Sequence, residues 1–416
     1  MSQDSGFGPY FTRRGRGNAL THFLMLVLGG GLAAVLLLVF GVASSSGISM
    51  PGGNAVPSPA GSAAPLAGNE QAIVTRVKPG VVIINTTLQY NSELAAGTGM
   101  VINSDGLVLT NNHVIEDSTA ITATVAATGK TYQARVIGYD KTGDIALIQL
   151  QNASGLTTVP IGDSASVKTG ETVVALGNAE GQNAIKTAAG HVTGLNETIT
   201  ASDEAGSTTS EMLHGMIQVN ADIVPGDSGG PLSGSGGVIG MDTAGNNGGY
   251  QEQAVGFAIP INTALSVARQ IAAGQASSTI TIGYPPFLGI FIGSGSESNP
   301  QAQAQQQEQQ QQQQNGFSGS PACYTSNANL TVPSTIAPVN SGTLIEGTIC
   351  GSPAAQAGLT GGAVITAVNG QAVGSPDDLS HVLARFHPGD TISVTWVSPS
   401  GQRTTSSLRL TAGPPQ

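Results

Sequence analysis

The hydrophobic residues of this chain fall into short runs that turn residues separate. Between about residues 70 and 275 these runs include GVVIIN (80–85), GMVIN (99–103), LVLT (107–110), ARVIGY (134–139) and DIALIQL (144–150). Short apolar runs between turn residues are typical of β-barrels and β-sandwiches. The segment INTALSVARQIAA (261–273) has helical spacing instead, and predicts a helix that ends this domain. The pattern therefore predicts a mainly β domain over residues 70–280.

A second α+β domain is predicted over residues 284–412. Its apolar runs are TLIEGTI (343–349), AVITAVNG (363–370) and TISVTWV (391–397), with a helix expected over DDLSHVLARF (377–386). The polar sequence QAQAQQQEQQQQQQ falls within an insertion at about 294–320. A low-complexity polar tract of this kind has no means of forming a core, so an insertion or linker is expected here.

The N-terminal region differs from both domains. Residues 23–43, FLMLVLGGGLAAVLLLVFGVA, form an uncharged apolar run, long enough to cross a hydrocarbon layer of about 30 Å as a helix. The run follows Arg13, Arg14 and Arg16, which places residues 1–22 in the cytoplasm and all residues after 43 outside. A cleaved signal peptide ending at Ala43 is the alternative, but signal peptides have shorter apolar cores. We therefore expect a single-pass protein of the cell membrane, with residues 44–69, rich in Ser, Gly, Pro and Ala, as a flexible linker.

Composition narrows the function further. The formal net charge is −11 and no basic stripe occurs, so a nucleic-acid partner is not expected. The sequence has none of the common metal-binding spacings, and we expect no metal and no organic cofactor. The two cysteines, Cys323 and Cys350, lie beyond the apolar run, where oxidising conditions favour a disulfide. Two buried free thiols are the alternative.

The sequence GDSGGP (226–231) is the strongest candidate for chemistry. A tight turn framed by glycines can expose the hydroxyl of Ser228 and direct backbone N–H groups at one point. Acyl transfer needs such donors, because the tetrahedral intermediate carries negative charge on the former carbonyl oxygen. Gly226 and Ser228 are the expected donors. A glycine-rich hairpin turn with an idle serine is the structural alternative.

A base and a carboxylate precede this serine in the chain. His113 follows the predicted strand LVLT, and Asp144 stands before the apolar run IALIQL, where burial is expected. A buried carboxylate that orients a histidine, which in turn activates a serine, is the arrangement of serine hydrolases. Asp140 is the alternative carboxylate, although its place in GYDKTGD is more typical of a turn residue.

The three segments TNNHVI, GYDKTGDIALIQL and GDSGGPL resemble the catalytic segments of HtrA/Deg serine proteases, and VIGMDTAG and AVGFAIPI resemble that family's closing strands. The resemblance covers residues 70–275. It implies a chymotrypsin-like double β-barrel in which Ser228 attacks the scissile carbonyl, His113 transfers the proton and Asp144 orients His113.

The C-terminal domain resembles an HtrA-type PDZ domain through SPAAQAGL (352–359) and VITAVNGQAV (364–373). The resemblance implies that C-terminal peptides bind through a loop of backbone N–H groups, which Phe287, Leu288, Gly289 and Ile290 match. A first β-strand at 287–292 is the alternative. The family resemblance also raises a homotrimer, but the few aromatic residues in the N-terminal part of the protease domain leave the oligomeric state open.

Two departures from the family concern the residues around the serine. Asp227 stands where HtrA proteins usually carry Asn, and no partner for it is evident. Asp222 stands at the spacing that leads to the base of the S1 pocket in chymotrypsin-like enzymes, where an aspartate selects basic P1 residues. Asp242 could add a second acidic group. If Asp222 turns away, Ile223 would line a pocket for small aliphatic residues, as in the family.

These observations predict a mainly β, membrane-anchored serine endopeptidase that hydrolyses unfolded or damaged extracytoplasmic proteins. Two alternatives remain: a regulatory protease that acts on one membrane partner, and a chaperone-like scaffold that only binds peptides.

Overall fold

The computed structural model describes residues 66–88, 93–202, 210–246, 255–293, 296–311, 323–327 and 330–415. The predicted cytoplasmic tail (1–22), transmembrane helix (23–43) and most of the linker (44–69) lie outside these residues. Within the described part of the chain, none of the helices has the length and apolar character needed to span a membrane.

The first half of the protease domain is a barrel made by the early apolar runs. The strands pair in the order β5-β4-β1-β2-β3-β6, and pairing of β5 with β6 closes them. They are β1 (Val81–Leu88), β2 (Glu93–Asn103), β3 (Leu107–Thr110), β4 (Ala120–Val125), β5 (Thr131–Asp140) and β6 (Ile145–Leu150). The short helix α2 (Asn112–Ile115) follows β3, and β13 (Ile280–Ile282) adds to the edge of β5.

The second half is a closed barrel with the strand order β10-β11-β12-β9-β8-β7. Its strands are β7 (Thr172–Gly177), β8 (Lys186–Ser202), β9 (Ser210–Val219), β10 (Pro231–Gly234), β11 (Gly237–Asn246) and β12 (Val255–Pro260). The 3₁₀ turns η1 (Lys78–Gly80), η2 (Ser164–Ser166) and η3 (Ala179–Gly181) complete the domain. The two barrels confirm the predicted mainly β trypsin-like architecture.

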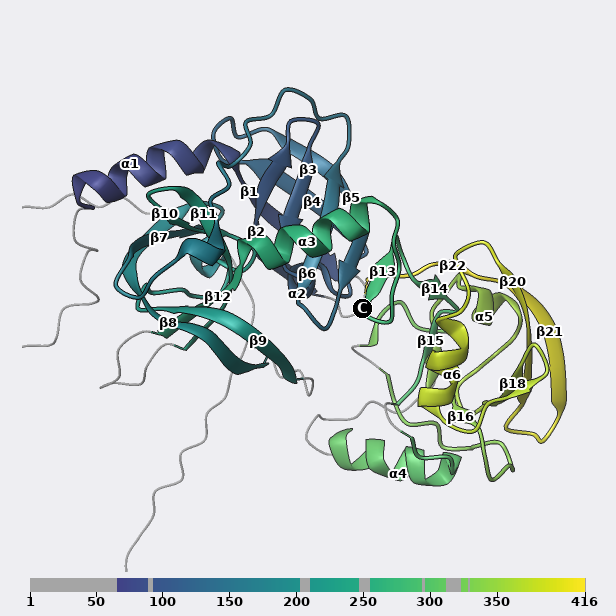
Figure 1. The fold of residues 1–416 in the computed structure, drawn as a ribbon. Helices are drawn as coiled ribbons and strands as arrows, with labels where there is room; N and C mark the ends of the chain where they lie inside the picture. Colours follow the sequence, from purple (N-terminus) through teal and green to yellow (C-terminus); the bar gives the residue numbers. More distant parts are fainter. Residues whose placement is uncertain are drawn as a thin grey trace, which may run out of the picture. The chain divides into compact units, whose positions relative to one another are not determined.

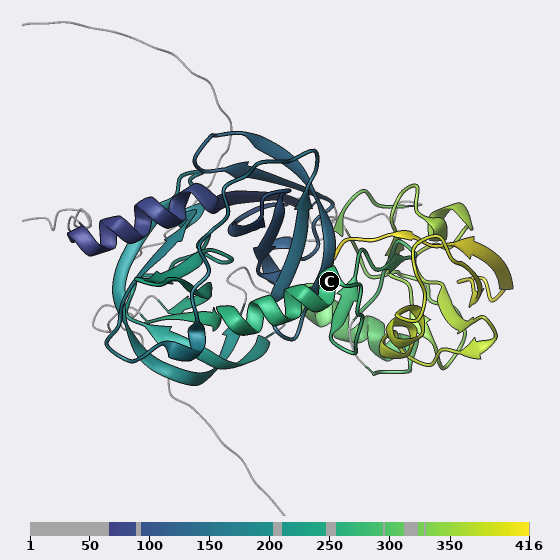
Figure 2. The ribbon, with the colours of Figure 1, turned by 45° about the horizontal axis from the view of Figure 1, so that its top comes forward.

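Two helices join the barrels into one domain. Helix α3 (Ile261–Ala272) lies across both barrels (Figures 1 and 2), and α1 (Gly68–Val77) lies beside strands of the second barrel. Their buried faces share one apolar cluster with side chains of both barrels, including Leu109, Leu147, Leu176 and Met241. Separate clusters fill the interior of each barrel. The seam between the barrels is therefore packed by side chains from both, and it carries the candidate active site.

The C-terminal domain has its own apolar core, to which Leu288, Leu379 and Trp396 belong. The strands of its main sheet follow the order β16-β18-β20-β21, and β19 pairs with β18. The elements are β14 (Pro286–Phe287), β15 (Ile290–Phe291), α4 (Pro300–Gln311), β16 (Thr343–Leu344), β17 (Gly347–Thr348), α5 (Pro353–Gln356), β18 (Val364–Val368), β19 (Gln371–Ala372), α6 (Pro376–Leu383), β20 (Thr391–Val397), β21 (Arg403–Arg409) and β22 (Thr411–Ala412). The alternative interpretation of residues 287–292 was a single first β-strand. The structure has two short strands in this region, β14 and β15.

The Gln-rich insertion corrects one expectation. The sequence indicated that it could not contribute to a core, but α4 forms there and buries Gln303 and Ala304. The amide of Gln303 donates to the carbonyl of Gly342 and accepts from the N–H of Leu344, so it pairs with the backbone on either side of Thr343 in β16. The expectation was wrong because glutamine favours helices and because its amide satisfies backbone groups of a sheet edge.

Candidate active site

His113 and Asp144 meet at the seam between the barrels. The Nδ1 atom of His113 lies 2.9 Å from Oδ2 and 3.0 Å from Oδ1 of Asp144. The backbone N–H of His113 also donates to Oδ1, at 3.1 Å. The side chain of Asp144 is only 2% exposed, against 26% for His113. The imidazole is therefore held at Nδ1 by a buried carboxylate while part of the ring stays accessible.

Thr243 of β11 connects this pair to the serine. Its hydroxyl donates a short hydrogen bond to Oδ2 of Asp144. Its carbonyl accepts from the hydroxyl of Ser228 at 3.4 Å. One residue of the second barrel thus contacts both the carboxylate of the first barrel and the candidate nucleophile. Thr243 was not among the site residues predicted from the sequence, because a threonine in a strand carries no distinguishing signal.

The turn that carries Ser228 lies between β9 and β10. The N–H of Asp227 donates to the carbonyl of Val224 at 3.0 Å. The N–H groups of Gly226 and Ser228, which flank Asp227 in the chain, have no acceptor among the described residues. Gly226 has a φ of 94°, and a Cβ at this position would lie 2.3 Å from the carbonyl oxygen of Asn178. Only glycine fits there without moving the backbone.

Thr98 of β2 holds this turn against the first barrel. Its N–H donates to the carbonyl of Ser228 at 2.9 Å, and its hydroxyl donates to the carbonyl of Gly226 at 2.7 Å. The same hydroxyl accepts from the N–H of Asn178 at 2.8 Å. Sequence reasoning also missed Thr98, because its partners lie 80 or more residues away in the chain.

Two carboxyl groups are buried close to the turn. Asp227 is 4% exposed and its Oδ2 accepts from the N–H of Val224 at 3.1 Å, which supplies the partner that the sequence did not reveal. Burial raises the pKa of Asp227 to about 6, and the hydrogen bond from Val224 offsets part of that rise. Asp242 is fully buried, and neither of its carboxyl oxygens has a hydrogen-bond partner within the described part of the chain. Burial raises the pKa of Asp242 well above its usual range, and the charge of Asp227 adds to the rise.

The remaining S1 candidates lie in different environments. Asp222 is exposed. Ile223 is 3% exposed and belongs to the apolar core of the second barrel, where it contacts Gly256. The alternative carboxylate, Asp140, accepts hydrogen bonds from the N–H of Gly143 and the hydroxyl of Thr279. The carboxylate that contacts Nδ1 of His113 is that of Asp144.

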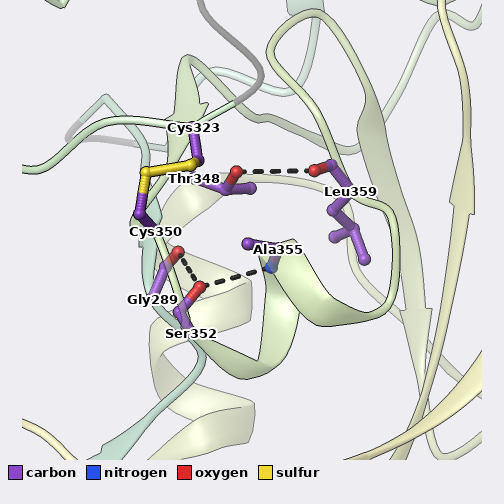
Figure 3. Close-up of a disulfide and its surroundings, with 7 residues drawn as sticks. All are labelled: Gly289, Cys323, Thr348, Cys350, Ser352, Ala355 and Leu359. Carbon is purple, nitrogen blue, oxygen red and sulfur yellow. Dashed lines mark hydrogen bonds between the residues drawn. A yellow bond between two sulfur atoms is a disulfide. The ribbon is translucent and has the colours of Figure 1, made fainter.

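The predicted peptide-binding loop of the C-terminal domain is tied to α5. Gly289 has a φ of 74°, and its carbonyl accepts from the hydroxyl of Ser352 at 3.0 Å. That hydroxyl also accepts from the N–H of Ala355 and caps α5 (Figure 3). Leu288 is buried in the domain core, whereas Phe287 and Ile290 are partly exposed.

The predicted disulfide is present in the same region. Cys323 and Cys350 are joined, and Figure 3 shows the bond beside Thr348 and Ser352. The hydrogen bond from the Cys350 N–H to the carbonyl of Tyr324 reinforces the link. The bridge therefore fixes the chain after the Gln-rich insertion to the turn that precedes α5.

Comparison with known proteins shows the same two-domain organisation. Residues 97–241 match the trypsin-like peptidase domain family, a range that contains His113, Asp144 and Ser228. Residues 347–397 match the PDZ domain family.

Several curated serine proteases are similar over longer stretches. Serine protease PepD of Mycobacterium tuberculosis is 28% identical over 388 residues, which cover 89% of this chain and 69% of PepD. The serine protease Do-like HtrA of Lactobacillus helveticus is 30% identical over 75% of this chain and 67% of its own length. The periplasmic pH-dependent serine endoprotease DegQ of Escherichia coli is 39% identical over 42% of this chain and 37% of DegQ. A solved structure of the HtrA-type protease AlgW with tripeptide is 25% identical, with a TM-score of 0.43.

The fold and these similarities define the chain as a serine protease with a trypsin-like domain followed by a PDZ domain. It belongs to the HtrA family of serine proteases.

Proposed function

We propose that this protein is a serine endopeptidase that cleaves through Ser228, His113 and Asp144. The observation that carries the proposal is the double contact of Thr243, whose hydroxyl bonds Asp144 and whose carbonyl accepts from Ser228. Together with the bonds from Asp144 to Nδ1 of His113, these contacts hold the nucleophile, base and carboxylate around one residue.

The proposed reaction begins with attack of the Ser228 hydroxyl oxygen on the scissile carbonyl. His113 takes the hydroxyl proton at Nε2, since Nδ1 is bonded to Asp144, and later gives it to the leaving amine. The N–H groups of Gly226 and Ser228 receive the oxyanion, which is consistent with the lack of an acceptor for them among the described residues. Water then hydrolyses the acyl-enzyme through the same base.

We further propose that the enzyme acts on unfolded or damaged proteins outside the cytoplasm. The support is the apolar run 23–43 with the preceding arginines, which would anchor the enzyme in the membrane with its domains outside. The PDZ domain would present substrate C-termini: peptide carboxylates would bind the N–H groups of the Phe287–Ile290 loop. The hydrogen bond from Ser352 to the Gly289 carbonyl supports this role, because it ties the loop to α5.

For the cleavage preference we propose small aliphatic P1 residues. Asp222 is exposed, and nothing holds its carboxylate in a desolvated pocket where it would select a cation. A P1-varied peptide library tests this with wild type and Asp222→Ala. Preference of the wild type for Arg or Lys, lost in the variant, would contradict it.

The function itself is tested by hydrolysis of fluorescently labelled casein by the full-length protein and by Ser228→Ala. The wild type is expected to degrade casein and the variant to leave it intact. Equal degradation by both, or by neither, would refute the proposed triad.

A further inference from the structure

Asp242 has surroundings that are unusual for an acidic residue. It lies on β11, it is fully buried, and neither carboxyl oxygen has a hydrogen-bond partner among the residues that the structure describes. An ionised carboxylate at such a position is strongly disfavoured, because burial removes its hydration and no described group replaces it. These surroundings therefore favour the neutral, protonated form of the side chain.

The backbone of Asp242 is bonded directly to the turn that carries Ser228. Its carbonyl accepts from the N–H of Gly229 at 2.8 Å, and its N–H donates to the carbonyl of Gly230 at 2.8 Å. The next residue, Thr243, bonds both Ser228 and Asp144. A shift of β11 at Asp242 would therefore displace the nucleophile and the contact that orders the triad.

Asp227 forms the other half of the arrangement. It precedes Ser228, it is 4% exposed, and Gly177 lies against its side chain so closely that a Cβ there would be 2.4 Å from Oδ1. Its charge acts on Asp242 and further raises the pKa of Asp242. The negative charge of Asp227 therefore helps Asp242 to keep its proton as the pH rises.

The other charged groups near the pair do not neutralise it. Asp222, Glu180 and Lys186 act on Asp227, but the ammonium of Lys186 already pairs with Glu180 at 3.2 Å. The strands on either side of β11, β10 (PLSG) and β12 (VGFAIP), contain no titratable residue. The helices that pack on β11 carry Glu70, Arg76 and Arg269, all with exposed or partly exposed side chains. Asp144 contacts Thr243 and His113.

We propose that Asp227 and Asp242 are positioning residues for Ser228, and that the turn keeps its catalytic geometry only while Asp242 retains its proton. While Asp242 is neutral, β11 keeps its two hydrogen bonds to the turn. Once the pH is high enough for Asp242 to ionise, a second buried negative charge drives β11 and the turn apart, so activity falls. The inference rests on the proposed role of Ser228, and it adds a limit to activity at high pH.

The first test is the pH profile of casein hydrolysis from pH 6 to 10 by the full-length wild type, Asp242→Asn and Asp227→Asn. The wild type is expected to lose kcat/KM progressively on the high-pH side of its maximum. Asp242→Asn, whose amide cannot ionise, is expected to retain its own maximum to a higher pH. Asp227→Asn, which removes the charge that raises the pKa of Asp242, is expected to begin its decline at a lower pH than the wild type. Asp140→Asn serves as the matched control, because it alters a carboxylate that is buried but hydrogen-bonded. The high-pH side of its kcat/KM profile is expected to match that of the wild type. An identical alkaline limb in all four proteins would overturn the proposal.

A second measurement separates this proposal from the proposed function. Thermal unfolding is followed from pH 5 to 9 with Ser228→Ala as the parent and with Asp242→Asn or Asp227→Asn added. The Tm of each double variant minus the Tm of the Ser228→Ala parent is expected to increase as pH rises, whatever its value at pH 5. A Tm difference that does not vary with pH in either variant would refute the carboxyl pair. Lack of casein hydrolysis by the wild type would instead refute the proposed function, while the Tm series still tests the pair. If Asp242→Asn does not fold, Asp227→Asn decides both measurements.

Discussion

Replacement of Thr243 by valine removes one hydroxyl and keeps the shape of the side chain. Oδ2 of Asp144 then loses this bond and keeps its contact with Nδ1 of His113 at 2.9 Å, while Oδ1 keeps its contacts with Nδ1 and the N–H of His113. A hydrogen bond to a charged group contributes about 1.5–3 kcal/mol, and the carboxylate of Asp144 is too buried for water to replace it. We expect Thr243→Val to lower the free energy of unfolding by about that amount.

The same substitution should also reduce catalysis. If the lost interaction stabilises the charged histidine–carboxylate pair in the transition state, 1.4 kcal/mol corresponds to about tenfold, so kcat/KM falls by roughly 10- to 100-fold. The assay is casein hydrolysis combined with urea denaturation. Thr243→Ser, which keeps the hydroxyl and loses a methyl group, is the control and should retain most of the activity. Equal kcat/KM for the valine and serine variants would refute the reasoning that this hydroxyl supports Asp144.

Three further predictions follow from particular contacts. Asp144→Asn should lower turnover by roughly 10⁴-fold, because the imidazole loses the acceptor that fixes its tautomer, and a larger effect of Asp140→Asn in the same assay would identify the other carboxylate. Replacement of both Cys323 and Cys350 by serine should lower the stability of the PDZ domain in urea by roughly 3.5 kcal/mol on the chain-entropy model for a separation of 27 residues; an unchanged denaturation midpoint would contradict this. Calorimetry on the Ser228→Ala protein should show tighter binding of a free apolar peptide C-terminus than of its amide, and equal affinities would argue against carboxylate recognition by the PDZ loop.

The pH dependence of stability provides another test. The pKa of Asp227 rises from 3.8 to about 6 on folding, so the folded protein retains this proton to higher pH than the unfolded chain does. The contribution of Asp227 to stability therefore falls between about pH 4 and 6, by roughly 3 kcal/mol at 1.4 kcal/mol per unit. Urea denaturation at pH 4 and pH 7 should show a smaller loss for Asp227→Asn than for wild type. Equal losses in the two proteins would contradict the raised pKa.

Much of the fold follows from local sequence pattern. The runs GVVIIN and DIALIQL become β1 and β6, and the helical segment at 261 becomes α3, because alternation and helical spacing act over a few residues. The pairing of His113 with Asp144 was also predictable, since His113 follows strand β3 and Asp144 directly precedes strand β6.

The rest of the site depends on contacts between distant residues. Thr98 and Gly226 are 128 positions apart, and Thr243 and Asp144 are 99 apart, so no local pattern reveals them. The burial of Asp242 could not be predicted from the sequence either, because it depends on how the strands of the closed barrel pack together. The helix at the Gln-rich insertion was missed because its stability comes from the docking of Gln303 against β16.

Covalent labelling tests most directly whether Ser228 is the activated nucleophile. The full-length protein is treated with a fluorophosphonate, digested, and searched by tandem mass spectrometry for the modified residue, with His113→Ala as the comparison. We expect a phosphonyl group on Ser228 in the wild type and loss of nearly all labelling in the His113→Ala variant. An unmodified Ser228 in protein that hydrolyses casein, or equal labelling of Ser228 in the two proteins, would contradict it.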